Sequence, residues 1–279
     1  MHPETEAIRT QSQRSQFAEH SSPLYLTSSF VFEDAEEMRA SFSEELDRNI
    51  YSRFTNPNTT EFVEKMVKLE GAEAGTAFAT GMSAVFSTLA ALLNSGDHII
   101  SARSIFGSTH SLFGKFFPKW NISHSYFPIE EPQKIEELIT PNTRLIFAET
   151  PTNPGVDILD LELLGKIAKK HNLLLIIDNC FATPILQNPI NYGADLVIHS
   201  ATKLIDGQGR VLGGVTVGRA DLTGLLPQEA DPRDKTAAAA QQFARGFRST
   251  RLAAMVAGLI AAVAGVITSA YVDVPPGST

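Results

Sequence analysis

Residues 173–203 read LLLIIDNCFATPILQNPINYGADLVIHSATK, and this stretch decides the fold. Residues 173–177 are a continuous apolar run that ends at Asp178, and a shorter run at residues 196–199 leads to Lys203. Uninterrupted apolar runs of this length are typical of parallel strands that are buried on both faces. Because ligands bind at the carboxyl ends of such strands, we expect Asp178 and Lys203 to face one crevice.

The side chains at these two strand ends suit the chemistry of pyridoxal phosphate. A lysine in a partly desolvated cavity loses its proton more readily and condenses with an aldehyde. A carboxylate such as Asp178 holds a pyridine nitrogen protonated, which makes the ring an electron sink. Ser200 and Thr202, close to Lys203, would donate hydroxyl hydrogen bonds to the phosphate. From spacing alone, the alternative is a solvated strand-end lysine and an acid that caps a loop.

Length and composition indicate a globular chain. With 279 residues and 43% hydrophobic content, the chain can bury the core of one large domain or one and a half. Acids outnumber bases 31 to 23 without any basic cluster, which argues against nucleic acid and anionic membranes as partners.

The cysteine and histidine residues indicate whether disulfides or metal sites are to be expected. Cys180 is the only cysteine, so an internal disulfide is excluded, and the N-terminal residues show no signal peptide. The histidines have no metal-ligand spacing, so we predict no metal site. A cytoplasmic enzyme is therefore the expectation.

Apolar runs and helical patterns alternate along most of the chain, which predicts a mainly parallel, doubly wound α/β sheet. One helix is expected to begin at Asn58, as an N-cap with Glu61 three residues on, and to stop at Gly71. Asp160 is expected to cap another. The predicted strands are 98–101, 122–127, 144–149, 173–177, 196–199 and 215–217, and the other predicted helices are 82–93, 108–117, 133–139 and 161–171.

Two loops carry further candidates for binding a cofactor. Gly81 precedes a predicted helix, where backbone N–H groups and the helix dipole favour a phosphate, although a simple turn is the alternative. Asn153 stands between Pro151 and Pro154, which forbid a helix and present its side chain from a stiff loop. For Asn153 the alternative is an Asx turn that stabilises the loop.

Several short motifs follow one another in a fixed order along the chain. They are YSR at 51–53 with NP at 56–57, TGMSA at 80–84, ETPTNP at 149–154, DN at 178–179, FATP at 181–184 and HSATK at 199–203. Together they resemble the Cys/Met-metabolism group of pyridoxal-phosphate enzymes, the trans-sulfuration enzymes. The resemblance covers about residues 5–220 and is greatest to O-succinylhomoserine sulfhydrylases. It implies the large domain of a fold-type-I enzyme.

The resemblance also implies a role for each candidate residue. Lys203 would bind the cofactor aldehyde and move protons, Asp178 would hold the pyridine nitrogen, and Asn153 would bind the phenolic oxygen. The phosphate would be held by Gly81, Met82, Ser200 and Thr202, together with Tyr51 and Arg53 of a neighbouring subunit. The functional unit is therefore expected to be a homodimer or tetramer.

Phe106 occupies a position where most members of the family have a tyrosine stacked on the pyridine ring. Phenylalanine stacks equally well but has no hydroxyl to move protons, which weighs against a lyase. The alternative is a core phenylalanine near a turn.

The activity that the resemblance implies is γ-replacement on O-succinylhomoserine, an activated homoserine, with sulfide to give homocysteine in methionine biosynthesis. Cystathionine γ-synthase, cystathionine γ-lyase and O-acetylhomoserine sulfhydrylase are the enzymatic alternatives. A non-catalytic fragment that at most binds the coenzyme is the alternative from another class.

The chain divides by composition into an N-terminal arm at 1–50, a cofactor-binding domain at 51–220 and an alanine-rich tail at 221–279. Residues 252–272 carry no charge and are long enough to span a bilayer, but alanine and glycine dominate them. We expect a tail from a shifted reading frame or a fusion, without membrane contact. It would replace the family's small C-terminal domain, whose arginine binds the substrate carboxylate.

Overall fold

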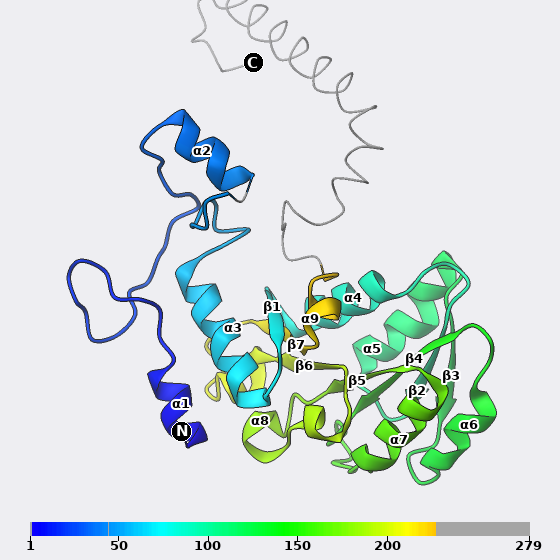
Figure 1. Cartoon of the computed structure of the whole chain (residues 1–279). Coiled ribbons are helices and arrows are strands. Elements are labelled where there is room, and N and C mark those ends of the chain that lie inside the picture. The colour runs from blue at the N-terminus through cyan, green and yellow to red at the C-terminus, as the bar shows by residue number, and fades with distance from the viewer. Residues whose placement is uncertain (1, 44, 227–279) are drawn as a thin grey trace, which may run out of the picture. The chain divides into compact units, whose positions relative to one another are not determined.

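The core of the protein is a seven-stranded sheet (Figure 1). A computed structural model describes residues 2–43 and 45–226, all of which belong to the unit Met1–Asp231. The strand order is β1-β7-β6-β5-β4-β2-β3; β7 pairs antiparallel with β1 and with β6, and the other neighbouring strands are parallel. The strands are β1 Ala74–Phe78, β2 His98–Ala102, β3 Ser123–Phe127, β4 Thr143–Glu149, β5 Leu174–Asp178, β6 Leu196–Ser200 and β7 Gly214–Gly218. The predicted, mainly parallel α/β sheet is confirmed.

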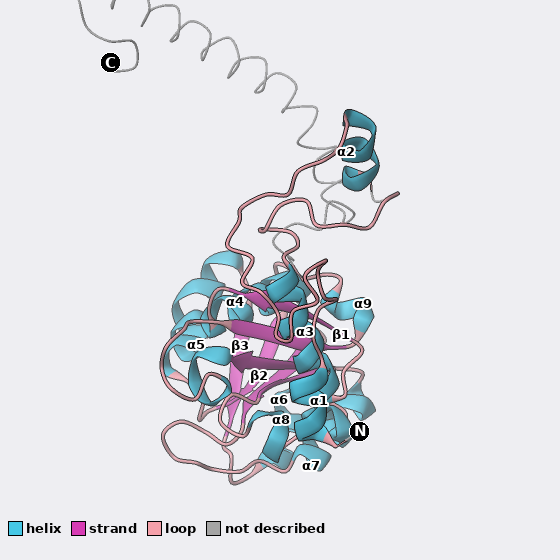
Figure 2. Ribbon diagram, turned by 90° about the vertical axis from the view of Figure 1, so that its left-hand side faces the viewer, coloured by secondary structure: helices cyan, strands magenta, loops and turns pink. Residues whose placement is uncertain are grey.

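Helices cover both faces of the sheet. Figure 2 shows α4 and α5 on one side and α3, α7 and α8 on the other. The central strands are therefore apolar on both faces, and Leu175, Ile176 and Ile177 of β5 are fully buried. The helices of this layered region are α3 Pro57–Glu70, α4 Gly81–Leu92, α5 Gly107–Ser111, α6 Ile135–Leu138, α7 Leu161–His171, α8 Thr183–Leu186 and α9 Ala220–Thr223.

The start of α3 corrects one sequence prediction. The N-cap is Asn56, whose side chain accepts a hydrogen bond from the Asn58 backbone, and Asn58 already lies in the first turn. Pro57 explains the shift, because its fixed φ suits the first helical position and its missing N–H is not needed there. Gly71 ends the helix in the left-handed conformation, at φ 72°, as predicted.

Asn58 and Glu61, expected to form the cap, instead hold the N-terminal arm. The Asn58 amide accepts from the Tyr25 backbone at 2.8 Å and donates to the Pro23 carbonyl at 2.7 Å. Glu61 accepts from the Ser12 backbone at 3.0 Å. The arm is thus attached to α3 by hydrogen bonds between backbone and side chains.

Two further helices were predicted as regular but are interrupted. The segment predicted at 108–117 is α5 followed by a π-helical turn, Leu112–Phe116, and a 3-10 helix, Phe117–Trp120. Pro118 accounts for the change, because it has no N–H to continue the α-helical ladder. The segment predicted at 133–139 begins as a 3-10 turn, Pro132–Lys134, before α6.

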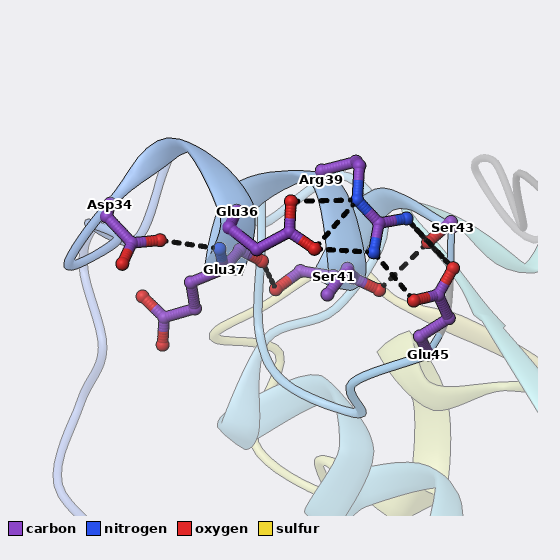
Figure 3. Close-up of polar contacts among 8 residues, drawn as sticks. Asp34, Glu36, Glu37, Arg39, Ser41, Ser43 and Glu45 are labelled. Carbon is purple, nitrogen blue, oxygen red and sulfur yellow. Dashed lines mark hydrogen bonds and ion pairs between the residues drawn. The ribbon is translucent and has the colours of Figure 1, made fainter.

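The arm contains two short helices that the sequence did not predict, α1 Pro3–Arg9 and α2 Ala35–Phe42. Figure 3 shows α2, where the side chain of Asp34 accepts from the Glu37 backbone. The Arg39 guanidinium lies between Glu36 and Glu45, at 2.7 Å from each. These charges are exposed, so they fix the local turn more than they stabilise the fold. Elsewhere in the arm, an isolated antiparallel bridge joins Ser29 to Tyr51.

In the part of the chain that the structure describes, no helix is both long and apolar enough to cross a bilayer. The uncharged stretch at 252–272 and the other tail predictions lie outside the described residues.

A fully buried hydrogen bond between two side chains joins α3 to β6, where the HSATK motif begins. Nε2 of His199 lies 3.1 Å from a carboxylate oxygen of Glu70, and both side chains are 0% exposed. The second carboxylate oxygen and Nδ1 have no other hydrogen-bond partner among the described residues. Each residue is therefore the other's main polar contact, and removing one leaves the other uncompensated.

Glu70→Ala should lower the free energy of unfolding by about 2 kcal/mol, because the His199 imidazole loses its acceptor. Glu64→Ala is the matched control, since Glu64 is exposed on the same helix and should cost less than about 0.5 kcal/mol. Urea unfolding of the three proteins measures both values. Equal losses for the two variants would show that the buried pair does not stabilise the fold.

Candidate active site

The carboxyl ends of β4, β5 and β6 bring the candidate residues together. Glu149 pairs with Asp178 and Asp178 pairs with Ile198 in the parallel register. Paired residues of adjacent strands share a face, and Ser200 lies two residues beyond Ile198 on that same face. Glu149, Asp178 and Ser200 are therefore adjacent at one edge of the sheet.

The start of α4 lies directly against the end of β6. A Cβ atom on Gly81 would stand 2.5 Å from Cβ of Ser200 and 2.7 Å from its hydroxyl oxygen, so only glycine fits there. A Cβ atom on Gly214 would likewise stand 2.2 Å from the Thr80 carbonyl oxygen. The Thr80 and Ser83 side chains cap the helix without using the first-turn amides of Gly81 and Met82, and Gly81 lies against the Ser200 hydroxyl. This arrangement suits a phosphate group.

Asp178 and Glu149 form a pair of carboxyl groups with raised pKa values. Burial raises the pKa of Asp178 to about 6, although the backbone N–H of Cys180, which donates to it at 3.1 Å, acts in the opposite direction. Burial, together with the neighbouring Asp178 charge, raises the pKa of Glu149 to about 7. Two carboxyls so placed favour a cation beside them, and a protonated pyridine nitrogen meets that requirement.

Phe106 and Asn153 both approach Glu149. Phe106 is the N-cap of α5, and its backbone N–H donates to a carboxylate oxygen of Glu149 at 2.5 Å. The backbone N–H of Asn153 also stabilises the ionised Glu149. The Asn153 side chain lies on a cavity of about 620 Å³ that Phe181 and Gln187 also line. The Phe106 side chain is 38% exposed, so the alternative of a core phenylalanine is wrong.

Lys203 lies in a π-helical turn, Ala201–Ile205, immediately after β6, and is exposed. Burial raises the pKa of the Cys180 thiol to about 11, the Asp178 charge raises it further, and the positive charge of Lys203 lowers it. Lys203 and Asp178 are thus both within electrostatic reach of Cys180. The Thr202 hydroxyl is held by Gly213, whose backbone N–H donates to it at 3.1 Å.

Tyr51 and Arg53 lie apart from these residues. The Arg53 guanidinium is over the rings of Tyr51 and Phe54, at 5.5 and 4.6 Å from their centroids. Arg53 is exposed and lines a separate cavity of about 440 Å³ with residues 76–79. Both side chains are accessible from outside the subunit, and their contact with a neighbour's cofactor remains a prediction.

The structure adds Glu149 to the predicted site. Sequence reasoning placed this residue in a motif but gave it no role, although it ends an apolar strand in the same way as Asp178. An acid at the end of an apolar strand is therefore the sequence pattern that could have identified Glu149 as a site residue. Among the described residues, no group of three or more His, Cys, Asp and Glu side chains could hold a metal ion.

This edge of the α/β sheet combines paired carboxyls and a lysine with a helix start that suits an anion, which is the arrangement expected for binding pyridoxal phosphate. The chain belongs to the family of Cys/Met metabolism PLP-dependent enzymes, whose model matches residues 4–250. The resemblance stated from the motifs is thereby confirmed, and pyridoxal phosphate is the cofactor of this family.

Individual relatives agree with the family assignment. The chain is 46% identical over 218 residues to O-succinylhomoserine sulfhydrylase of Pseudomonas aeruginosa, covering 78% of this chain and 54% of that protein. It is 37% identical over 219 residues to L-methionine gamma-lyase of Fusobacterium nucleatum, covering 78% and 55%. A solved structure from Campylobacter jejuni, which contains N'-pyridoxyl-lysine-5'-monophosphate, has a TM-score of 0.75 and 34% identity, covering 81% and 56%. The chain thus spans about half the length of the curated relatives it matches.

Residues 235–279 match a second family model, described as the ABC 3 transport family. The two matches overlap at residues 235–250. The end of the chain therefore resembles a family different from that of the rest, and its origin by fusion or by a shifted frame stays a prediction.

The raised pKa of Asp178 predicts how stability depends on pH. Between its ordinary value of 3.8 and about 6, the folded protein binds more protons at this site than the unfolded chain, so stability falls as the pH rises. Asp178→Asn removes this pH-dependent loss of stability. It also removes the charge that raises the pKa of the neighbouring Glu149. The variant should therefore gain stability relative to the wild-type protein as the pH rises through this window.

Urea unfolding of both proteins without added cofactor, from about pH 4 to about pH 8, measures this difference. A difference that stays constant across the range would contradict a raised pKa at Asp178.

Proposed function

We propose that the chain contributes the cofactor-binding domain of an enzyme that replaces the γ-substituent of O-succinylhomoserine with sulfide. The Cγ–O bond breaks, succinate leaves, and a Cγ–S bond forms to give homocysteine, a reaction of methionine biosynthesis. The single observation that carries this choice is that residue 106, which the family resemblance implies would stack on the ring, is a phenylalanine without a hydroxyl. The likeness to O-succinylhomoserine sulfhydrylases supports the same choice.

Lys203 is the residue that we expect to bind the cofactor through Nζ. It would then remove protons from Cα and Cβ of the substrate and return them, because no hydroxyl on Phe106 can do so. When bound, pyridoxal phosphate supplies an electron sink for the charge left on those carbons. Asp178 would keep the pyridine nitrogen protonated, and Phe106 would stack on the ring.

The remaining candidates would hold the cofactor in place. The amides of Gly81 and Met82 and the hydroxyls of Ser200 and Thr202 would bind the phosphate, and the Asn153 amide would bind the phenolic oxygen. This proposal takes its geometric support from the close contact of Gly81 with Ser200.

A second subunit completes the phosphate site in this proposal. Tyr51 and Arg53 are accessible, and a guanidinium fork suits a phosphate dianion. The working unit would be a homodimer or tetramer in the cytoplasm. Sedimentation of the cofactor-loaded chain as a monomer with full cofactor affinity would contradict this part of the proposal.

The first competing function is that of a lyase or another trans-sulfuration enzyme, and the similarity to L-methionine gamma-lyases favours it. The second is a chain that binds the cofactor without turnover, which the half-length match favours. The family's small domain normally holds the substrate carboxylate with an arginine. Without that contact a substrate loses both affinity and orientation.

A substrate panel separates these functions. The purified chain with pyridoxal phosphate should bind the cofactor yet turn over O-succinylhomoserine and sulfide at far below about 10 per second, an ordinary enzyme rate. Any product should be homocysteine, whereas methionine alone should release no thiol. O-acetylhomoserine should be a poorer substrate than O-succinylhomoserine.

Each of the other outcomes has a definite meaning. Thiol release from methionine would assign a lyase and overturn the proposed reaction. Turnover at an ordinary enzyme rate would show that the chain needs no further domain.

A further inference from the structure

Glu149 is a buried acid to which the proposed reaction assigns no role. Its side chain lies at the carboxyl end of β4 and the residue is only 4% exposed. A buried carboxyl is costly unless polar groups surround it, so its contacts show what it does. Its hydrogen bond is with the Phe106 backbone N–H, and the Asn153 backbone N–H and the Asp178 charge act on its pKa.

The two amides belong to the two residues that we expect to contact the cofactor ring. Phe106, which donates to Glu149 at 2.5 Å, follows β2 and precedes α5. Asn153 belongs to the loop after β4, and its N–H lowers the pKa of Glu149. The hydrogen bond therefore joins Glu149, at the end of β4, to the loop between β2 and α5.

Packing alone does not hold Phe106 in place. The residue is 38% exposed, and α5, which begins at Gly107, has only five residues. Phe106 as N-cap makes no side-chain hydrogen bond to the helix. Its backbone carbonyl accepts from the His110 N–H at 2.9 Å within α5, and its N–H bond to Glu149 is the contact that ties the residue to the sheet.

We propose that Glu149 is a positioning residue, which holds Phe106 against the cofactor ring by accepting its backbone N–H group. This inference rests on the proposed function, because that function places the ring next to Phe106. It assigns Glu149 no contact with substrate.

Two substitutions separate the role of the acceptor from that of the charge. Glutamine has nearly the same shape and keeps a carbonyl oxygen that can accept the Phe106 N–H, whereas alanine keeps neither. Glu149→Gln should therefore behave like the wild-type protein in holding Phe106, and Glu149→Ala should not. Glu162→Ala, an exposed change on α7, is the control for an acid outside the site.

The first measurement needs no cofactor. Hydrogen exchange at the Phe106 amide should be at least about tenfold faster in Glu149→Ala than in the wild-type protein, because a hydrogen bond to a charged group is lost. It should be nearly unchanged in Glu149→Gln and Glu162→Ala. Unchanged Phe106 exchange in a folded Glu149→Ala protein would overturn the proposal.

If Glu149→Ala does not fold, Glu149→Leu removes the acceptor while filling the space, and the same exchange result is expected of it. Far-UV circular dichroism decides which of the two variants is used.

The second measurement asks whether Glu149 acts through Phe106. The dissociation constant of pyridoxal phosphate should rise about tenfold for Glu149→Ala in the wild-type background. Glu149→Ala should change this dissociation constant little in a protein that already carries Phe106→Ala, because the side chain that Glu149 positions is then absent. Glu149→Ala should also alter the visible circular dichroism of the bound cofactor in the wild-type background, and should alter it little in the Phe106→Ala background.

Equal effects of Glu149→Ala in both backgrounds would show that Glu149 acts independently of Phe106, and would overturn the proposal. Failure of the proposed function looks different, since it shows in the wild-type chain itself, either as thiol release from methionine in the substrate panel or as no bound cofactor. The exchange measurement keeps its meaning in either case.

Discussion

The parallel pairing of β4, β5 and β6 is the constraint on which the site depends. It aligns Glu149 with Asp178 and Asp178 with Ile198, so the groups that follow each strand meet at one edge. A slip of one residue would turn every side chain of a strand to the other face. The apolar runs of these strands set that register, and the buried pair of Glu70 and His199 secures β6 against α3. The same hydrogen-bonded pairing of strands therefore both packs the core and aligns the residues of the site.

The site also requires the backbone of α4 to lie very close to β6, and that of β7 to lie very close to Thr80. α4 begins against β6 only because Gly81 lacks a Cβ atom, and β7 passes Thr80 only because Gly214 lacks one. The result is an anion site made mostly of backbone, in which Gly81 lies against the Ser200 hydroxyl. Asp178 and Glu149 stand a short distance along the same edge with raised pKa values. The edge therefore combines a place for a phosphate with a place for a cationic ring nitrogen.

Much of this arrangement could be predicted from local sequence. The runs that end at Asp178 and Lys203 identified two strand ends, and the alternation of elements indicated a parallel sheet. The N-cap of α3 was wrong, because Pro57 moves the cap to Asn56 and leaves Asn58 to bind the arm. The role of Glu149 could not be predicted, since its partner Phe106 is 43 residues away and contributes only a backbone N–H. Such contacts follow from tertiary structure and have no spacing in the sequence.

The central claim is that Lys203, at the end of β6, is the residue to which the cofactor is bound. Borohydride reduction of the chain with pyridoxal phosphate, followed by proteolysis and mass spectrometry, tests it most directly. The account predicts one pyridoxyl adduct, located on the peptide that contains Lys203. It also predicts that the adduct disappears in Lys203→Ala and persists in Lys166→Ala, an exposed lysine on α7. An adduct at a different lysine, or none at all, would contradict the account.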